Sequence, residues 1–207
     1  MNAPTTLTAP AIPSVPNSGM DEDIFEQFAE QLQRYVRERL IPAEAQVIAE
    51  DRVPDAILAE MRDMGLFGLS VPEEFGGAGL NMTQYARVVN IMAYAAPAYR
   101  SIFSINVGMF SSALKNGATP AQKAEWYPQI AQGKIACFGL TEPGSGSDSA
   151  GLATTAVPDP SGNGWILNGT KRYITNAPHA DVALIMARTN KEALPKNAHV
   201  SAFIVPM

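Results

Sequence analysis

The first half of the chain has the hydrophobic spacing of α-helices. From Asp21 onward, apolar residues recur every three or four positions, which predicts a helix with one apolar stripe. The members of this stripe are Ile24, Phe25, Phe28, Leu32, Tyr35, Val36 and Leu40. Pro42 should kink or restart the helix because proline cannot donate a backbone hydrogen bond. A second helix is predicted from Pro54 to Gly65, and the glycine-rich residues 66–81 predict a loop.

Residues 81–114 carry only two charged side chains, Arg87 and Arg100. Helices that are apolar on all sides are buried, so this stretch predicts two central helices of a bundle. Pro97 should divide them, and Gly117 should end the second. A more polar helix is predicted over residues 120–132, and Gly133 closes it.

After Gly133 the helical spacing gives way to short runs of strand-forming residues separated by turn formers. The predicted strands are Ile135–Leu140, Ala153–Val157, Trp165–Leu167, Arg172–Thr175, Val182–Ala187 and Val200–Val205. Because no helices lie between them, they favour a barrel or sandwich over a parallel α/β sheet. The predicted fold class is therefore α+β, with an all-α bundle over residues 21–134 and a β-barrel domain over residues 135–207. The chain ends directly after a strand, which predicts that the barrel is truncated.

Composition excludes several functions. The 207 residues carry a net charge of −5 and no run of Lys or Arg, which argues against nucleic-acid binding. Cys137 is the only cysteine and there are two histidines, His179 and His199, so we expect no metal site and no disulfide. Residues 1–20 predict a disordered tail without the features of a signal or transit peptide. No apolar stretch is long enough to span a membrane, so we expect a cytoplasmic protein.

The segment from Cys137 to Asp148, CFGLTEPGSGSD, is the candidate for chemistry. It predicts a strand that enters a turn rich in glycine and hydroxyl side chains, and such a turn exposes N–H groups to a phosphate or a carbonyl-rich ring. It is not a Rossmann loop, because the residues after Gly146 indicate loop and strand instead of a helix. An ordinary glycine-rich turn remains an alternative. Lys171 and Arg172 could attract a phosphate, but a solvated strand end is the more frequent arrangement. Cys137 is interpreted as a buried, inert strand residue.

The sequence LTEPGSGSD closely resembles the flavin-binding signature of the acyl-CoA dehydrogenases. The segments PEEFGGAG, NGTKRYITNA and ALIMART occur in the order found in that family. The family has an N-terminal helical domain, a middle β-barrel and a C-terminal four-helix domain. The resemblance extends from about Asp21 to Met207, and it implies that the C-terminal four-helix domain is missing from these 207 residues.

The resemblance implies that two segments bind FAD. The implied FAD-binding residues are Phe138, Leu140, Thr141, Gly146, Ser147, Tyr173, Ile174 and Thr175. Ser147 should also meet the acyl-CoA. Two positions depart from the family pattern: Phe138 replaces a tyrosine and loses its hydroxyl, and Tyr173 replaces a tryptophan and loses the indole N–H. Without the resemblance, Tyr173 would be interpreted as a cross-strand packing residue.

Arg100 is the second candidate. A cation near a helix N-terminus opposes the helix dipole, and one on a buried helix needs a partner. That partner is either a carboxylate of the protein or an anionic ligand. The stretch YRSIFS weakly resembles the glutaryl-CoA dehydrogenase branch, in which the arginine and a serine, here Arg100 and Ser104, bind the distal carboxylate of the substrate.

The implied reaction is α,β-dehydrogenation of an acyl-CoA thioester with FAD, as in fatty acid metabolism. The family's catalytic base is a glutamate of the C-terminal domain, beyond residue 207, so no catalytic residue is assigned, and none of Glu73, Glu74 or Glu142 takes that role. We therefore expect the 207 residues alone to be inactive. The implied partners are an electron-transfer flavoprotein as acceptor and further copies of the chain, in a tetramer or dimer. Alternatives are an acyl-CoA oxidase or flavin monooxygenase of the same fold, or a non-catalytic flavin- or CoA-binding remnant.

Overall fold

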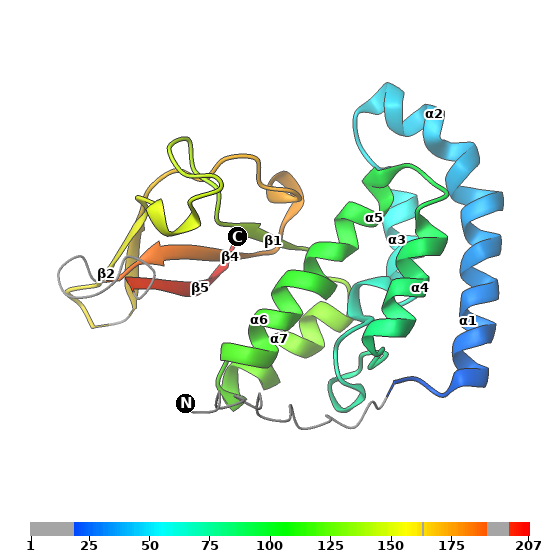
Figure 1. Cartoon of the computed structure of the whole chain (residues 1–207), viewed down its shortest axis with the longest axis horizontal. Helices are drawn as coiled ribbons and strands as arrows, with labels where there is room; N and C mark the ends of the chain where they lie inside the picture. The colour runs from blue at the N-terminus through cyan, green and yellow to red at the C-terminus, as the bar shows by residue number, and fades with distance from the viewer. Residues whose placement is uncertain (1–18, 163, 190–198) are drawn as a thin grey trace, which may run out of the picture.

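The computed structural model describes residues 19–162, 164–189 and 199–207. A helical part comes first and a sheet part second, and the two lie side by side (Figure 1). This confirms the predicted mixture of helix and sheet and the order of the two parts. The predicted tail over residues 1–20 lies almost entirely outside the described residues.

Seven α-helices are described in the helical part, with two π-helical segments between them. The α-helices are α1 (Glu22–Tyr35), α2 (Ile41–Glu50), α3 (Asp55–Asp63), α4 (Met82–Met92), α5 (Pro97–Ser104), α6 (Ser111–Gly117) and α7 (Pro120–Ala131). The π-helical segments are η1 (Val36–Leu40) and η4 (Ile105–Phe110), and short 3₁₀ turns occur at η2 (Leu66–Gly68), η3 (Glu73–Phe75), η5 (Ser149–Gly151) and η6 (Ala177–His179). The predicted loop over residues 66–81 therefore contains two of these turns.

Pro42, which was predicted to kink or restart the helix, lies in the first turn of α2, and α2 follows η1 without a gap. Asp21 caps α1 by accepting hydrogen bonds from the amides of Asp23 and Ile24, at 3.0 and 3.3 Å. The π-helical segment η1 then leads directly into α2. A π-helical turn changes the pairing of backbone groups, so the missing amide hydrogen of Pro42 is accommodated without ending the helix.

The core of the helical part is formed by α1, α3, α4 and α5. Its largest fully buried side chains include Phe25, Phe103 and Tyr99, and the Tyr99 hydroxyl donates to the carbonyl oxygen of Leu40 at 3.0 Å. The prediction that residues 81–114 are buried on all sides is wrong for α4. Its side chains at Met82 and, just beyond its end, Tyr94 are 80% and 77% exposed. The helix packs against α1 along one face, and Met82 on its other face is exposed among the described residues.

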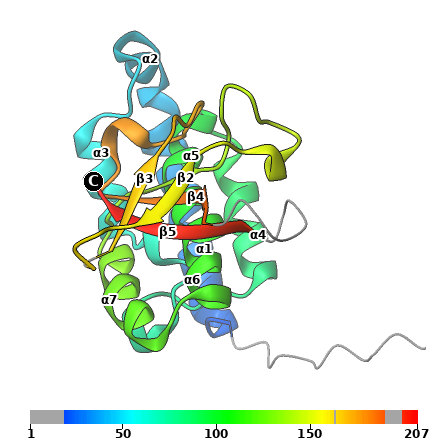
Figure 2. The same ribbon diagram turned by 90° about the vertical axis from the view of Figure 1, so that its left-hand side faces the viewer.

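The described strands form a single mixed sheet with β4 at its centre (Figure 2). The strands are β1 (Ala136–Gly139), β2 (Thr155–Pro158), β3 (Trp165–Asn168), β4 (Val182–Arg188) and β5 (Val200–Pro206). Strand β4 pairs in parallel with β1 and antiparallel with β5 along its whole length. It also meets the start of β2 in parallel, and β2 forms an antiparallel hairpin with β3.

The predicted strand Arg172–Thr175 is wrong. Tyr173 has a φ of 57° and Asn176 a φ of 70°, in the left-handed region. Extended strands need negative φ, so a strand cannot continue through these residues.

Two asparagines fasten the sheet to the long helix formed by α5, η4 and α6. The buried Asn106 of η4 donates to the carbonyl of Lys134 at 2.6 Å and accepts from the amide of Ala136 at 2.8 Å. Asn176 donates to the carbonyls of Ile102 and Ala136, at 2.8 and 3.0 Å. Both backbone groups of Ala136 are therefore held by side-chain amides. This fixes the first strand, and the loop that follows it, relative to α5.

Candidate functional site

The glycine–serine loop (residues 140–148) follows β1 and is a tight turn. The amide of Glu142 donates to the carbonyl of Ser145 at 2.9 Å, and the amide of Ser145 donates to the carbonyl of Glu142 at 3.1 Å. The Ser145 hydroxyl donates to the carbonyl of Asp148 at 2.6 Å. This folding leaves Gly146 and Ser147 exposed. A Cβ added at Gly146 would meet no atom within 4 Å, so a ligand can approach the loop backbone closely.

The second predicted cofactor segment, Tyr173–Thr175, lies beside this loop. The amide of Arg172 donates to the carbonyl of Thr141 at 2.8 Å. The Tyr173 ring is 78% exposed, and the Arg172 guanidinium lies 4.4 Å from its centre. A positive φ is rare for a bulky residue and is typical of sites where the surrounding structure imposes a conformation. The structure therefore brings Thr141 and the Tyr173 segment together, and it presents the Tyr173 ring to solvent beside the loop.

A buried ion pair connects the two segments. The Lys171 ammonium donates to the Glu142 carboxylate at 2.7 Å and to the carbonyl of Leu140 at 3.2 Å. The Glu142 carboxylate also accepts bonds from the amides of Ala153 and Thr154, at 2.5 and 2.9 Å, and from the Thr154 hydroxyl.

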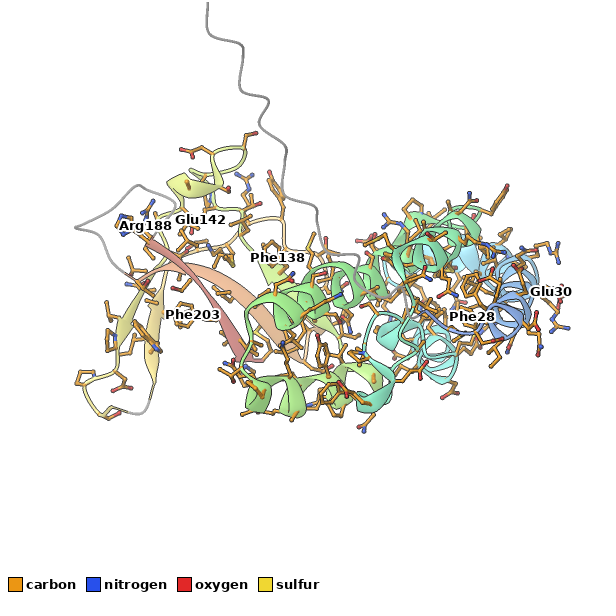
Figure 3. The ribbon with its side chains drawn as sticks, turned by 60° about the horizontal axis from the view of Figure 1, so that its bottom comes forward. Phe28, Glu30, Phe138, Glu142, Arg188 and Phe203 are labelled. Atoms are coloured by element: carbon orange, nitrogen blue, oxygen red, sulfur yellow. The ribbon has the colours of Figure 1, made fainter. Side chains whose placement is uncertain are left out.

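The two side chains of the pair are 10% and 5% exposed, so the prediction of a solvated Lys171 is wrong. Glycine at position 139 leaves room for the lysine stem, because a Cβ there would lie 3.2 Å from the Lys171 Cγ. In Figure 3, Glu142 lies near Arg188. That arginine donates to the carbonyl of Leu152 at 2.7 Å, on the same stretch of chain before β2.

The hydrogen bonds to Glu142 change its pKa. Burial alone raises the pKa of this carboxyl, but the bonds from Lys171, Thr154 and two backbone amides outweigh burial and lower the pKa to about 2.

We therefore expect acid to destabilise the protein through Glu142. A group whose pKa is lowered by folding stabilises the protein above its unfolded pKa, and that stabilisation is lost as the pH falls through the folded value. The free energy of unfolding should fall by about 3 kcal/mol between roughly pH 5 and pH 2 because of this group. Urea denaturation across this range measures it, and Glu142→Gln should remove most of that dependence. A variant with the full pH dependence would contradict the assignment.

Arg100 and Ser104 lie four residues apart on α5, and so on one face of that helix. Within the part of the chain that the structure describes, the Arg100 side chain makes no ion pair. Its charge acts on the partly buried phenol of Tyr85: burial raises the pKa of Tyr85, and Arg100 opposes that rise. The Ser104 hydroxyl donates to the carbonyl of Ser101 at 3.3 Å. No carboxylate of the described protein neutralises Arg100, which leaves it available to an anion.

A side-chain hydrogen bond from Asn176 connects the two candidate sites. Asn176 directly follows the segment Tyr173–Thr175. Its side-chain amide donates to the backbone carbonyl of Ile102, which lies between Arg100 and Ser104 on α5. Phe138 of β1 and Leu140, the first residue of the glycine–serine loop, are half-buried.

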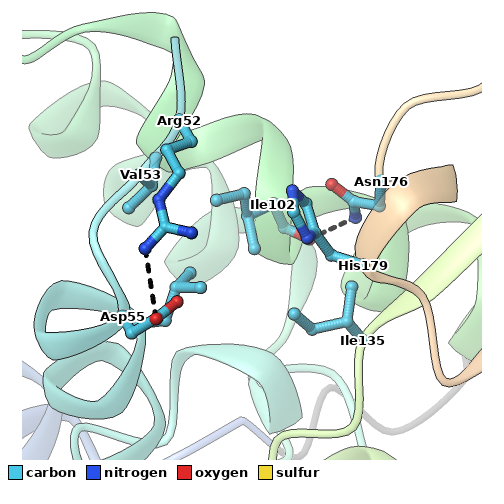
Figure 4. Close-up of a pocket in the computed structure, with 8 residues that line it drawn as sticks. Arg52, Val53, Asp55, Ile102, Ile135, Asn176 and His179 are labelled. Carbon is cyan, nitrogen blue, oxygen red and sulfur yellow. Dashed lines mark hydrogen bonds and ion pairs between the residues drawn. The ribbon is translucent and has the colours of Figure 1, made fainter. Parts of the chain in front are cut away.

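A separate pocket lies where the helical and sheet parts meet (Figure 4). Its lining includes Ile102, Asn176 and His179, together with Arg52 and Asp55, which pair at 3.1 Å. None of the predicted cofactor residues lines it. In the described ranges no cluster of histidine, cysteine and acidic residues could hold a metal ion, and no helix there could cross a membrane.

Sequence reasoning missed four residues that shape the site. The roles of Asn106 and Asn176 depend on contacts across 28 to 74 positions of the chain. Glu142 and Lys171 meet across 29 positions. The signature TEP and the motif NGTK were visible in the sequence, but nothing local to either one indicates that their charged side chains meet.

The described chain thus combines a helical part, a mixed sheet and an exposed glycine–serine loop between β1 and β2. Residues 23–134 match the family model of the acyl-CoA dehydrogenase N-terminal domain, and residues 137–207 match that of the middle domain. The chain belongs to the acyl-CoA dehydrogenase family.

Individual relatives agree with this assignment. The chain is 37% identical over 174 residues to the mitochondrial short-chain specific acyl-CoA dehydrogenase of Bos taurus, covering 84% of this chain and 41% of the relative. It is 36% identical over 179 residues to (2S)-methylsuccinyl-CoA dehydrogenase of Cereibacter sphaeroides, covering 84% of this chain and 32% of the relative. The structure of a glutaryl-CoA dehydrogenase from Mycobacterium smegmatis in complex with FADH2 has a TM-score of 0.77 and 32% identity, covering 90% of this chain and 46% of that one. The chain thus spans less than half the length of these relatives.

Proposed function

We propose that this chain is the FAD-binding part of an acyl-CoA dehydrogenase, which converts an acyl-CoA thioester to its enoyl-CoA. The observation that carries the proposal is the exposed glycine–serine loop held against the Tyr173–Thr175 segment. The family membership and the FADH2 complex of a 32% identical relative support it. FAD, when bound, would accept the hydride that leaves the β-carbon of the substrate.

The residues present fit this cofactor. Gly146 and Ser147 are exposed and Thr141 is half-buried, and in this proposal their amides and hydroxyls donate to the carbonyl-rich ring and the ribityl chain. Tyr173 offers an exposed ring face, and Ile174 and Thr175 continue the same segment. Phe138 of β1 and Leu140 of the loop supply apolar contact. In this proposal Ser147 also contacts the thioester part of the substrate. The sheet would form part of the family's middle barrel.

The first test is Gly146→Val. The position has open space and no positive φ, so valine should fold normally but its branches should block the approach of the cofactor to the backbone. We expect FAD affinity to fall by about tenfold or more, equivalent to about 1.4 kcal/mol, measured by titrating FAD into the FAD-free protein.

Gly117→Val is the matched control, because position 117 also has open space and lies at the end of α6. A folded Gly146→Val protein that binds FAD as tightly as the parent would show that the cofactor site is elsewhere.

The substrate class follows from Arg100. We propose that Arg100, assisted by Ser104, binds a second carboxylate at the far end of the acyl group. Arg100 has no ion-pair partner among the described residues, and two relatives are named for substrates with such a group, methylsuccinyl-CoA and glutaryl-CoA. An arginine is suited to this role because its planar guanidinium binds a carboxylate through two parallel hydrogen bonds.

The remaining partners are proposals of the same kind. An electron-transfer flavoprotein would accept the electrons, and further copies of the chain would complete a dimer or tetramer. A cytoplasmic location is likewise proposed from the sequence. Mixing the reduced protein with a purified electron-transfer flavoprotein, and following reduction of the acceptor, tests the first of these directly.

A further inference from the structure

We infer that the Glu142–Lys171 ion pair positions the two flavin-contacting segments relative to each other. This inference rests on the proposed FAD site. Both side chains are largely buried. Their role would be to act through the backbone, so both are positioning residues.

The pair joins three stretches of chain at one point. Glu142 belongs to the glycine–serine loop, and its carboxylate also holds the amides of Ala153 and Thr154 before β2. Lys171 comes two residues before Tyr173 and reaches back to the carbonyl of Leu140. The loop, the start of β2 and the approach to Tyr173 therefore share one ionic centre.

Apart from this pair, the bonds of Asn176 to Ala136 and Ile102 hold the end of the second segment, and few bonds join the two segments directly. The backbone bond from Arg172 to Thr141 is the one described main-chain link between them, since residues 172–175 form no strand. A single bond leaves a segment free to pivot, whereas a lysine held at two acceptors and a carboxylate held by four donors define a direction as well as a distance.

The packing around the pair leaves little room for adjustment. A Cβ at Gly169 would lie 2.7 Å from the Thr154 Cα, so the backbones on either side of the pair are in close approach. Every donor around Glu142 points at a carboxylate oxygen. A glutamine there would turn its NH₂ group toward one of those donors, and could not reproduce the arrangement.

The test compares Glu142→Gln, Lys171→Met and the double variant. FAD affinity and the band shape of the bound flavin spectrum report on the site, and urea denaturation of the FAD-free protein reports on stability. Hydrogen exchange of residues 140–148 and 171–175 without FAD reports on the loop itself. Glu26→Gln is the control. It breaks an exposed ion pair, between Glu26 of α1 and Arg87 of α4, that lies outside the proposed FAD site.

We expect each single variant to weaken FAD binding by about 10- to 100-fold, the range found when residues that orient metal ligands are replaced. Exchange in both segments should accelerate. The double variant should regain stability, because no unpaired charge remains buried, but it should not regain FAD affinity or the parent spectrum. If Lys171→Met does not fold, Lys171→Arg keeps the charge while displacing its donors, and the same comparison applies.

Two results would overturn the inference. In the first, FAD affinity changes in parallel with stability in every variant, and both recover in the double variant. The pair would then have a structural role only. The other is parent-like affinity, spectrum and exchange in the single variants. If Gly146→Val still loses FAD in that second case, the proposed function stands and only the positioning role fails. A parent protein that binds no FAD would remove both.

Discussion

Arg100→Ala should weaken the binding of glutaryl-CoA to the FAD-loaded protein by about 2–5 kcal/mol, or roughly 30- to 5000-fold. Butyryl-CoA, which has the thioester but no distal carboxylate, should lose much less. The measurement is the dissociation constant of each thioester, followed through the change that it causes in the flavin absorption spectrum.

The size of the effect follows from where Arg100 lies. The side chain is half-buried, on the helix that carries the carbonyl bonded to Asn176. Truncating one partner of a desolvated charge pair leaves the other charge without compensation, and most of the loss comes from that penalty. A ligand without the second carboxylate leaves no such charge behind.

Two variants control this experiment. Arg100→Lys keeps the charge but loses the planar fork, so it should recover only part of the discrimination between the two thioesters. Arg87→Ala removes an arginine of α4 that pairs with Glu22 and Glu26, and it should affect both thioesters equally. Equal losses on both ligands in Arg100→Ala would refute the proposal and indicate a structural cation.

Local patterns were sufficient to predict the order of helices and strands. The stripe through Phe25 and Leu32 becomes the buried face of α1, and the apolar run Val182–Ala187 becomes the central strand β4. Each depends on spacing within a few residues, which the sequence displays directly. The turn after β1 was also predictable, because glycine and serine at residues 144–147 favour no regular structure.

The errors arise where distant groups decide the local conformation. Residues 172–175 have strand-forming side chains, but Lys171 is drawn to Glu142 and the chain turns at Tyr173 with positive φ. Tertiary contacts of this kind override local preference. The low charge of residues 81–114 indicated burial, yet Met82 is exposed. Composition shows that a helix face is apolar, but it does not show whether other parts of the same chain bury that face.

Residues 1–207, tested as they stand with FAD supplied, should not oxidise acyl-CoA. Removing the α-proton of a thioester needs a positioned base, and such groups contribute about 10²–10⁴-fold to the rate. Glu142 is the acidic residue within the turn of the glycine–serine loop, but its carboxylate accepts four hydrogen bonds and its pKa is lowered to about 2. A carboxylate so well satisfied is a poor proton acceptor.

Other acidic residues near the sheet do not replace it. Asp181 accepts the amide of Ile135 at 2.8 Å, on the side of β1 where the strand begins. Asp148 is exposed at the surface of the loop. We therefore expect acyl-CoA to bleach the flavin of this protein at least about 10²-fold more slowly than that of the Bos taurus short-chain enzyme, under anaerobic conditions. Bleaching at a comparable rate would mean that a base lies within residues 1–207. Glu142→Gln and Asp148→Asn would then show which carboxylate removes the proton, because only the loss of the base itself should stop the reaction while FAD is saturating.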